Sequence, residues 1–318
     1  MSKSLFDSRF VINTGKGGVG KTMVSVAMAV AFAQRGKRVL LMQLNVPDRL
    51  GAMYGLAPIG PEIVELAPLI DAVDTTPADA LREYALMILK VKAVYRAVFE
   101  NKVVSKLLRV MPGLPELTML GKAYYHEQER DPRGRARYDV VIIDAPATGH
   151  GMFLLQIPQV IASALHTGRM AEESARMLAL LEDPQRTVVN IVTLPEEMPA
   201  NECVELHQQL SRQFDIRVGA VIANQVISPL LAESELANVR MLLNAHGNER
   251  DEVGRLLAAS VFRERRAALQ RTHIDRLRRS VPVPVVEIPY YFEPRFDRTV
   301  VDRMAAHITA HIAHAVAA

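Results

Sequence analysis

A run of residues near the N-terminus has the types and the spacing of a phosphate-binding loop: Gly15-Lys16-Gly17-Gly18-Val19-Gly20-Lys21-Thr22. It matches G-x-x-x-x-G-K-[ST], in which glycines let backbone N–H groups converge on phosphate oxygens at the positive end of a helix. In that geometry the Lys21 ammonium contacts the β- and γ-phosphates, and the Thr22 hydroxyl binds Mg²⁺. We therefore predict a triphosphate site built from Gly15, Gly17, Gly18, Val19, Gly20, Lys21, Thr22 and Met23.

The same glycines also fit the dinucleotide-binding fingerprint G-x-G-x-x-G, which is the competing interpretation. That fingerprint requires an acidic side chain about 20 residues further on, to bind a ribose hydroxyl. At that point the chain has Gln43-Leu44-Asn45, which carries no carboxylate. The fingerprint also leaves Lys21 and Thr22 without a role, so the triphosphate interpretation is preferred.

A second motif, residues 138–144, is an apolar strand that ends in Asp144. A strand buried on both faces has little reason to end in a carboxylate unless a cation or a dipole compensates its charge. We predict that Asp144 holds the Mg²⁺ shell through water, together with Thr22. The following turn, residues 145–151, would then lie beside the γ-phosphate, with the Gly149 N–H as its sensor.

These motifs need a scaffold that brings the ends of several strands together. Continuous apolar runs, rather than alternating ones, are typical of parallel strands covered on both faces. With helical patterns between them, they predict an α/β fold with a doubly wound, mostly parallel sheet. The expected strands are Phe10–Thr14, Arg38–Gln43, Asp139–Asp144, Thr187–Thr193, Arg217–Ala223 and Pro284–Ile288.

Two stretches depart from this alternation, about 77–130 and 160–185, and we expect them to be helical insertions. No internal repeat and no Gly/Ser-rich linker divides the chain, so residues 1–318 are expected to form a single domain. The apolar faces of the insertions can pack against the sheet, or they can bind a partner. We favour packing against the sheet, with a partner surface as the alternative.

Composition indicates a globular protein, because 49% of the residues are hydrophobic and 23% are charged. A net charge of +3, few aromatic residues and no Trp argue against nucleic-acid binding. The arginine-rich stretch 263–279 keeps DNA binding as an alternative, although we expect a solvated helix face there. No apolar stretch reaches the ~20 residues of a membrane span, and residues 1–9 lack the apolar core of a secretory signal. We expect a cytoplasmic protein.

The loop with Lys16 resembles that of the deviant Walker A ATPases. Other motifs are similar to the branch that holds the arsenical-pump ATPases and the eukaryotic ATPase that targets tail-anchored membrane proteins. The chain is most similar to single-domain bacterial members of that branch, and the resemblance covers about residues 15–295. The motifs are 144–150 with 154–158, 112–116, Pro195-Glu196 with Glu202, Asn224-Gln225 and 289–293.

This resemblance implies the P-loop NTPase fold and hydrolysis of ATP by in-line attack of water on the γ-phosphate. It implies that Lys16 reaches across a two-fold interface to the partner's phosphates, so that a dimer switched by nucleotide is the competent unit. Asn224 would read the adenine edge, and Pro289, Tyr291 and Phe292 would wall the base pocket. From the sequence alone, Asn224 could instead be a strand-end amide that satisfies its own backbone.

The chain departs from the family pattern where the family's first switch has an Asp that activates water. Asn45 stands at that position, and an amide can hold water but cannot accept its proton. General-base catalysis is typically worth ~10²–10⁴-fold, so we expect ATP to bind normally and to turn over slowly. Asp48 could substitute for the missing base, and Gln43 could orient the water.

Cys203 is the only cysteine, so neither a zinc clasp nor an arsenite-binding cysteine cluster can form within one chain. We expect ATP and Mg²⁺ but no zinc, and a homodimer or a heterodimer with a homologous ATPase. The expected client is a protein, and a membrane-linked protein is one form of this expectation. Two alternatives remain open: a nucleotide-gated adaptor or chaperone with incidental turnover, and a ParA-like ATPase associated with DNA.

Overall fold

A computed structural model describes residues 5–46, 50–89, 113–165, 167–247 and 251–315. In this part of the chain, one eight-stranded sheet has the order β3-β4-β2-β5-β1-β6-β7-β8. All neighbouring strands are parallel except β3, which runs antiparallel to β4. The strands are β1 (Phe10–Thr14), β2 (Val39–Leu44), β3 (Val64–Ala67), β4 (Ile70–Thr75), β5 (Val140–Asp144), β6 (Thr187–Thr193), β7 (Val218–Val226) and β8 (Val285–Pro289).

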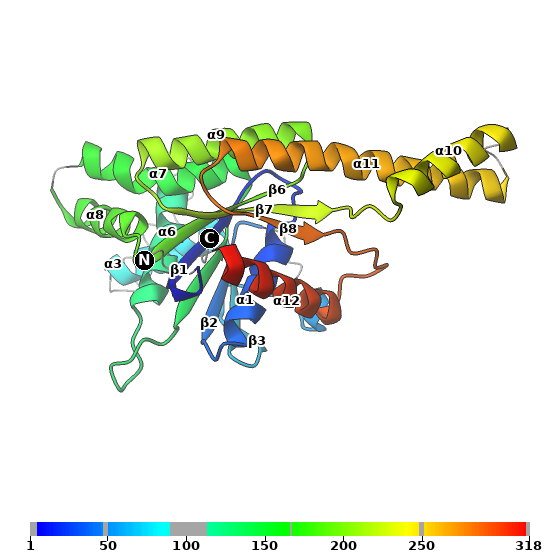
Figure 1. The fold of residues 1–318 in the computed structure, drawn as a ribbon. Coiled ribbons are helices and arrows are strands. Elements are labelled where there is room, and N and C mark those ends of the chain that lie inside the picture. Colours follow the sequence, from blue (N-terminus) through cyan, green and yellow to red (C-terminus); the bar gives the residue numbers. More distant parts are fainter. Residues whose placement is uncertain (1–4, 47–49, 90–112, 166, 248–250, 316–318) are drawn as a thin grey trace.

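The predicted doubly wound α/β fold is confirmed, with helices on both faces of the sheet (Figure 1). All six predicted strands are present, with small shifts at their ends. The central strands β1, β2, β5 and β6 are buried along their whole length. Their side chains meet helices on both faces, which explains why they are apolar without alternation.

The hairpin of β3 and β4 at one edge of the sheet was not predicted. Its strands are interrupted by polar residues, such as Asp71 and Asp74 of β4, and β3 is only partly buried. A short edge strand lacks the continuous apolar run that identified the other strands. Its place beside β2 is set by pairing and not by local composition.

Two hydrophobic clusters divide the core between the two faces of the sheet. On one face, α1 (Lys21–Ala33) is covered by α12 (Arg298–Ala315), and the short segments η1 (Leu5–Asp7) and α2 (Leu50–Tyr54) complete this layer. The other face is covered by α6 (Leu114–Gln128), α7 (Thr148–Ala164), α8 (Arg169–Glu182) and α9 (Glu197–Gln213). Helix α1 also contacts a polar side chain of the sheet, because Asn13 of β1 donates to Ser25 of α1.

Both predicted helical insertions contain helices, with one correction to a boundary. The first comprises α3 (Pro77–Leu89) and α6, while residues 90–112 lie outside the described part of the chain. The second helical block was predicted to begin at 160, but α7 begins at Thr148 and continues through Pro158. The switch turn was predicted over residues 145–151, but residues 148–151 form the first turn of α7, so only 145–147 precede the helix.

The arginine-rich stretch lies in α11 (Glu252–Ser280), which pairs with α10 (Glu233–His246) as a helical hairpin (Figure 1). Within α11, Ala267, Ile274 and Leu277 are buried, whereas Leu269 is exposed. Several arginines form ion pairs within the chain: Arg266 with Glu196, and both Arg271 and Arg278 with Glu287.

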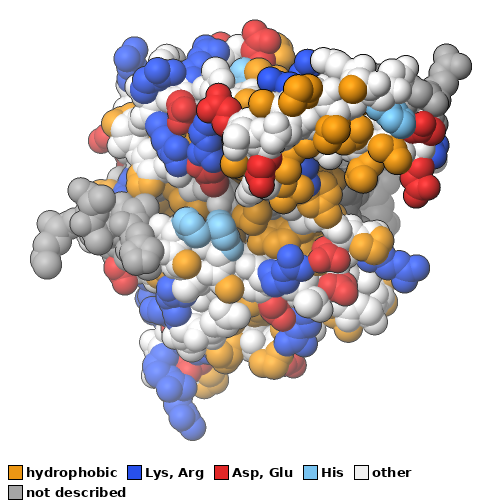
Figure 2. All heavy atoms as spheres, turned by 45° about the vertical axis from the view of Figure 1, so that its right-hand side comes forward, with side chains coloured by type: hydrophobic (Ala, Val, Ile, Leu, Met, Phe, Trp, Pro, Cys, Tyr) orange, Lys and Arg blue, Asp and Glu red, His pale blue; other side chains and the backbone are white. Residues whose placement is uncertain are grey.

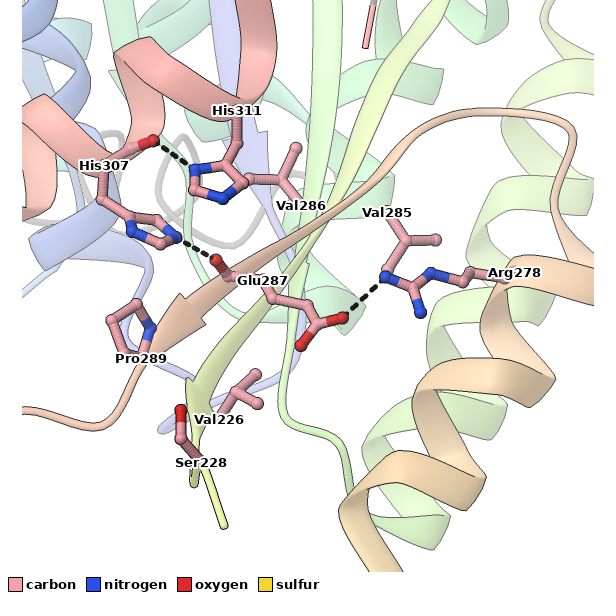
Figure 3. Close-up of a pocket in the computed structure, with 9 residues that line it drawn as sticks. All are labelled: Val226, Ser228, Arg278, Val285, Val286, Glu287, Pro289, His307 and His311. Atoms are coloured by element: carbon pink, nitrogen blue, oxygen red, sulfur yellow. Dashed lines mark hydrogen bonds and ion pairs between the residues drawn. The ribbon is translucent and has the colours of Figure 1, made fainter. Parts of the chain in front are cut away.

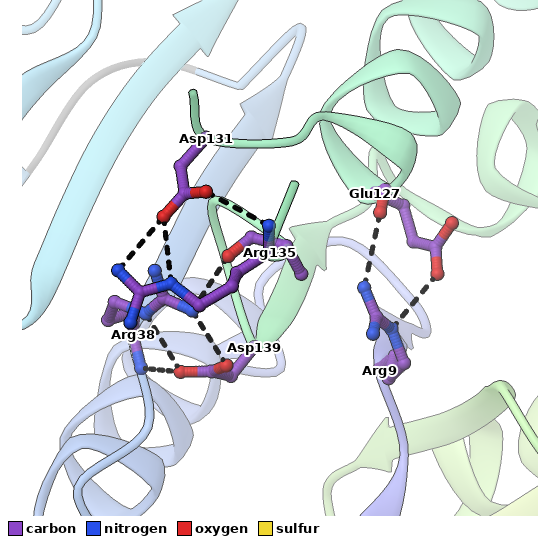
Figure 4. A network of polar contacts seen from close by, with 7 residues as sticks. Arg9, Arg38, Glu127, Asp131, Arg135 and Asp139 are labelled. Carbon is purple, nitrogen blue, oxygen red and sulfur yellow. Dashed lines mark hydrogen bonds and ion pairs between the residues drawn. The ribbon is translucent and has the colours of Figure 1, made fainter. Parts of the chain in front are cut away.

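Ion pairs tie together the amino ends of the strands (Figure 4). Arg38, directly before β2, contacts Asp139, directly before β5, at 3.0 Å. Arg9, directly before β1, contacts the buried carboxylate of Glu127 at 3.2 Å. This end of the sheet is thereby closed by structural contacts, and the carboxyl ends of the strands remain for a binding site.

Candidate functional site

The phosphate-loop residues connect the end of β1 to the start of α1, as the motif requires. Gly15 has φ +144°, and a Cβ there would lie 2.1 Å from the Val192 carbonyl oxygen. Gly20 has φ +89°, and a Cβ there would lie 2.3 Å from Asn224 Nδ2. Both positions require glycine, because a side chain would force the loop away from β6 and β7.

Lys21 lies in the first turn of α1 with its side chain buried against the loop. Its ammonium donates to the carbonyl oxygens of Gly15, at 3.2 Å, and Lys16, at 3.0 Å. Burial lowers the pKa of this ammonium, and the nearby Asp144 carboxylate opposes that shift. The cation is therefore held where phosphate oxygens could replace backbone carbonyls as its partners.

Thr22 and Asp144 meet as the two motifs predicted. The Thr22 hydroxyl donates to Asp144 Oδ2 at 2.6 Å, while Oδ1 has no hydrogen-bond partner among the described residues. Burial raises the pKa of Asp144 to about 6, although the Thr22 hydroxyl and the Lys21 charge favour its ionised form. A buried carboxylate oxygen without a partner, next to a hydroxyl, fits the oxygen ligands that Mg²⁺ prefers.

A row of polar side chains crosses the sheet at Asp144. Strand register aligns Gln43 of β2 with Asp144 of β5, then with Asn13 of β1 and Asn190 of β6, and all four are fully buried. Asn190 donates to Asn13, and Asn13 donates to Ser25 of α1. Neither amide atom of Gln43 has a hydrogen-bond partner by geometry among the described residues, but the amide lies near enough to Asp144 to favour the ionised form of that carboxyl.

A pocket of about 740 Å³ opens in front of the loop and is large enough for a nucleotide. Of the predicted site residues, Gly17, Gly18, Gly20, Lys21, Thr22, Met23, Asn45, Asn224, Pro289 and Tyr291 line it. Gly15, Lys16, Val19, Asp144 and Phe292 do not. Lining residues that sequence reasoning missed include Ala52, Met53, Phe296 and Met304.

Asn224 is engaged by the protein's own backbone in this conformation. Its Nδ2 donates to the Val19 carbonyl at 2.8 Å, and its Oδ1 accepts from the Gln225 N–H at 3.0 Å. The amide therefore links the end of β7 to the phosphate loop. Gln225 has φ +60°, so the chain turns sharply just as it leaves this contact.

The loop after β8 supplies aromatic side chains at the pocket. Tyr290 and Tyr291 line the pocket, while Phe292 is 63% exposed and packs on Tyr290 with ring centroids 4.5 Å apart. Burial raises the pKa of Tyr291, so its hydroxyl stays protonated at neutral pH. Aromatic faces of this kind can stack on a base.

Asn45 follows β2 at the pocket, with an exposed side chain and φ +52°. Asn tolerates the left-handed region better than most residues, and its backbone N–H donates to the Thr75 carbonyl at 3.0 Å. Asp48 lies outside the described residues. Gly149 lies in the first turn of α7, and this helix begins directly after the pocket-lining Ala147.

Lys16 does not point into the pocket. Its ammonium forms an ion pair with Glu202 of α9 at 2.5 Å, with about a third of each side chain exposed. In the sequence, Glu202 stands out only as part of a family motif. Its contact with the loop joins residues far apart in the chain.

A second cavity, of about 520 Å³, lies beside β8 between α11 and α12 (Figure 3). His307 Nε2 is 2.6 Å from the Glu287 carbonyl oxygen, and His311 Nδ1 is 2.9 Å from the His307 carbonyl oxygen. Their rings stack at 4.0 Å. Pro289 lines both this cavity and the nucleotide-sized pocket.

The fold, the loop and the Thr22–Asp144 contact together define a P-loop NTPase with an additional lysine in its loop. A family model described as anion-transporting ATPase (ArsA) matches residues 8–173 and 164–256, which is more than half of the chain. The chain therefore belongs to the ArsA family of ATPases. No helix in the described residues is long and apolar enough to cross a membrane.

Relatives bear the names of several kinds of ATPase. ATPase BagA from Mycobacterium tuberculosis is 26% identical over 234 residues, covering 72% of this chain and 68% of that protein. An arsenical pump-driving ATPase from Acidiphilium multivorum is 28% identical over 242 residues, covering 71% of this chain but only 40% of that protein. ATPase GET3 from Kluyveromyces lactis is 24% identical over 254 residues, covering 69% and 72%.

Proposed function

We propose that this chain binds Mg²⁺–ATP in the pocket in front of residues 15–22 and hydrolyses it as part of a nucleotide-switched dimer. The observation that carries this proposal is the 2.6 Å contact between Thr22 and the buried Asp144, whose second oxygen has no partner among the described residues. Two separate motifs meet there, and one of them contributes Thr22 to the lining of a nucleotide-sized pocket. Thr22 and Asp144 would hold Mg²⁺, which would supply positive charge beside the phosphates.

The chain's own residues have separate tasks in this proposal. Backbone N–H groups of the loop and the Lys21 ammonium bind the phosphates, and Thr22 and Asp144 hold the cation. The Gly149 N–H senses the γ-phosphate from the first turn of α7. Pro289, Tyr291 and Phe292 wall the base, and Asn224 reads its edge once the amide leaves its backbone partners.

We infer slow hydrolysis, because the exposed side chain at the pocket beside β2 is the amide of Asn45. An amide can orient the attacking water but cannot remove its proton. The buried Gln43, two residues before Asn45 in the chain, pairs with Asp144 in the register of β2 and β5. The energy of ATP binding, more than the rate of turnover, would then drive the conformational switch.

Lys16 is proposed to cross a two-fold interface and contact the partner's phosphates, which requires it to leave Glu202. The partner would be a second copy or a homologous ATPase, and the dimer would act on a client protein. One P-loop domain, residues 1–318, is inferred, since a single sheet spans β1 to β8 and α12 packs back on α1.

The test is nucleotide binding followed by turnover. Lys21→Ala should abolish binding of a fluorescent ATP analogue, because the loop loses its buried cation. Lys37→Ala is the matched control, since Lys37 lies before β2 at the opposite end of the sheet. Retention of binding by Lys21→Ala, or no binding by the wild type, would overturn the proposal.

The adaptor alternative keeps the same site and differs only in turnover. It is favoured by the amide at Asn45, and steady-state phosphate release distinguishes it from an efficient ATPase. The DNA-associated alternative is less well supported, because Arg266, Arg271 and Arg278 are engaged in ion pairs within the chain. Salt-dependent DNA retention that is lost in an Arg276/Arg278/Arg279 triple alanine variant would restore it.

A further inference from the structure

The long helix α11 buries one narrow face against β7, β8 and α9. Figure 2 shows charged side chains gathered along the top of the molecule, the side on which α9 and α11 lie in Figure 1. The buried residues of α11 recur at every third or fourth position from Val261 to Leu277, as expected for one face of a helix. Two of them are polar, Glu264 and Gln270, with exposed fractions of only 6% and 4%. Burial of a polar side chain is unfavourable unless it forms hydrogen bonds.

Both groups of the Gln270 amide bind the backbone at the end of β7. Its Nε2 donates to the Gln225 carbonyl at 3.1 Å, and its Oε1 accepts from the Ile227 N–H at 2.7 Å. The two contacts flank Val226, whose own carbonyl accepts from the Tyr290 N–H at 2.8 Å. One side chain of α11 thus fixes three consecutive residues, and these residues hold the start of the loop after β8.

The segment held by Gln270 connects two walls of the nucleotide-sized pocket. Gln225 lines the pocket and directly follows Asn224, which is proposed to read the base. Tyr290 lines the pocket from the loop after β8. The distance between these two walls therefore depends on the backbone at Val226, which Gln270 holds from outside the pocket.

The turn at Gln225 needs such a restraint. Gln225 has φ +60°, a left-handed conformation that is unfavourable for a residue with a side chain. Residues of this kind persist where their surroundings fix them, and they cluster at ligand-binding sites. The Gln270 amide binds the carbonyl of Gln225 itself, and Val226 clusters with the buried Ile274 of α11. Without the amide, the turn can relax toward an ordinary conformation, and the walls on either side of it move.

We propose that Gln270 is a positioning residue for the base of the bound nucleotide. This inference rests on the proposed ATP site, in which the loop of residues 15–22 binds the phosphates. Gln270 keeps Asn224 and Tyr290 at a fixed spacing around the base, although it does not itself line the pocket. It therefore acts on the base half of the ligand and leaves the phosphate half unchanged.

Glu264 provides a matched comparison on the same face of α11. Its Oε1 accepts from the Leu230 N–H at 2.7 Å and from the Leu231 N–H at 3.3 Å. These two residues belong to the same connection after β7 but do not line the pocket. Replacing either Glu264 or Gln270 with leucine removes a buried acceptor of backbone N–H groups. Only Gln270→Leu removes a contact to a pocket-lining residue.

The experiment compares two ligands by calorimetry in the presence of Mg²⁺: a non-hydrolysable ATP analogue and inorganic triphosphate, which has no base. For Gln270→Leu we expect the affinity for the ATP analogue to fall about five- to tenfold, the effect of the lost hydrogen bonds. Its affinity for triphosphate should not change. Glu264→Leu should bind both ligands as the wild type does. Gln270→Met, which keeps the length of the side chain and makes neither hydrogen bond, should show the same selective loss and carries the test if the leucine variant does not fold.

Equal loss of affinity for both ligands, or no loss for either, would overturn the positioning role of Gln270. The same selective loss in Glu264→Leu would show a general effect of loosening α11 and would also overturn it. So would a wild type that binds the two ligands equally well, because the base would then contribute nothing to affinity. A wild type that binds neither ligand would instead overturn the proposed ATP site, and the inference with it.

Discussion

The ammonium of Lys16 lies 2.5 Å from the carboxylate of Glu202, so the lysine proposed to serve a partner is held by its own chain. Lys16 belongs to the phosphate loop and Glu202 to α9. Any movement of Lys16 toward another subunit must break this ion pair. The pair thus opposes the proposed closed dimer, and its strength affects how readily that dimer forms.

Removing the carboxylate should favour the dimer. For Glu202→Gln we expect nucleotide-dependent dimerisation to strengthen by about two- to fivefold, because a partly exposed ion pair is worth ~0.2–1 kcal/mol. Sedimentation at several concentrations with an ATP analogue measures this. Glu205→Gln, which changes a neighbouring exposed residue of α9, is the control. Equal dimerisation of the two variants would contradict the proposal that the Lys16–Glu202 ion pair opposes the dimer.

Restoring a carboxylate beside the pocket should accelerate hydrolysis. We expect Asn45→Asp to raise the rate of phosphate release at least tenfold, since a general base typically contributes ~10²–10⁴-fold. Affinity for the ATP analogue should change little. If the wild type already hydrolyses ATP as fast as its relatives do, and Asn45→Ala alters nothing, the role of Asn45 is wrong.

The loop glycines should differ in their tolerance of a methyl group. Gly15→Ala places a Cβ 2.1 Å from the Val192 carbonyl oxygen, whereas at Gly17 the nearest atom is Ala147 Cβ at 3.7 Å. We expect Gly15→Ala to reduce the free energy of unfolding by roughly 2–4 kcal/mol and to impair nucleotide binding. Gly17→Ala should unfold like the wild type in urea. Similar unfolding curves for the two variants would contradict the close approach of Gly15 to β6.

Burial of Asp144 should make stability depend on pH in the absence of Mg²⁺. Its pKa is about 6 in the folded chain and 3.8 as the reference value, so the folded state binds the proton more tightly. The contribution of Asp144 to the free energy of unfolding should therefore fall as pH rises from about 4 to 6, by up to ~3 kcal/mol. Asp144→Asn should flatten this dependence and should also lose Mg²⁺-dependent nucleotide binding. Urea unfolding of the wild type and of Asp144→Asn across this pH range tests this, and a difference in stability between them that does not change with pH contradicts the assignment.

The buried amide of Gln43 should cost stability. Gln43→Leu removes two buried polar atoms that have no partners among the described residues, and we expect it to stabilise the fold by about 1 kcal/mol. The same change should weaken Mg²⁺-dependent binding of the ATP analogue, because Asp144 loses the polar side chain beside it on β2. A variant that is both less stable and normal in binding would show that Gln43 is simply well packed. Asn190→Leu is unsuited as a control, because Asn190 bonds to Asn13.

The strands β1 and β5 and the phosphate loop were predictable because their signals are local. An apolar run followed by glycines, or by Asp144, specifies a strand and its ending within a few residues. The doubly wound class followed from those runs and from the helical patterns between them. The contact between Thr22 and Asp144 was also predictable, since the carboxyl ends of adjacent parallel strands meet at one edge.

The remaining features depend on pairs of residues that are distant in the chain. Strand register alone sets Gln43 beside Asp144, and packing of α9 alone brings Glu202 to Lys16. The β3–β4 hairpin has no strong local pattern, and the exposure of the hairpin of α10 and α11 shows only when the helices are placed relative to the sheet. Local propensity and periodicity carry information over a few residues, so the sequence by itself determined the loop, the main strands and the fold class. Which side chains are buried, paired or exposed around the pocket was decided by tertiary packing.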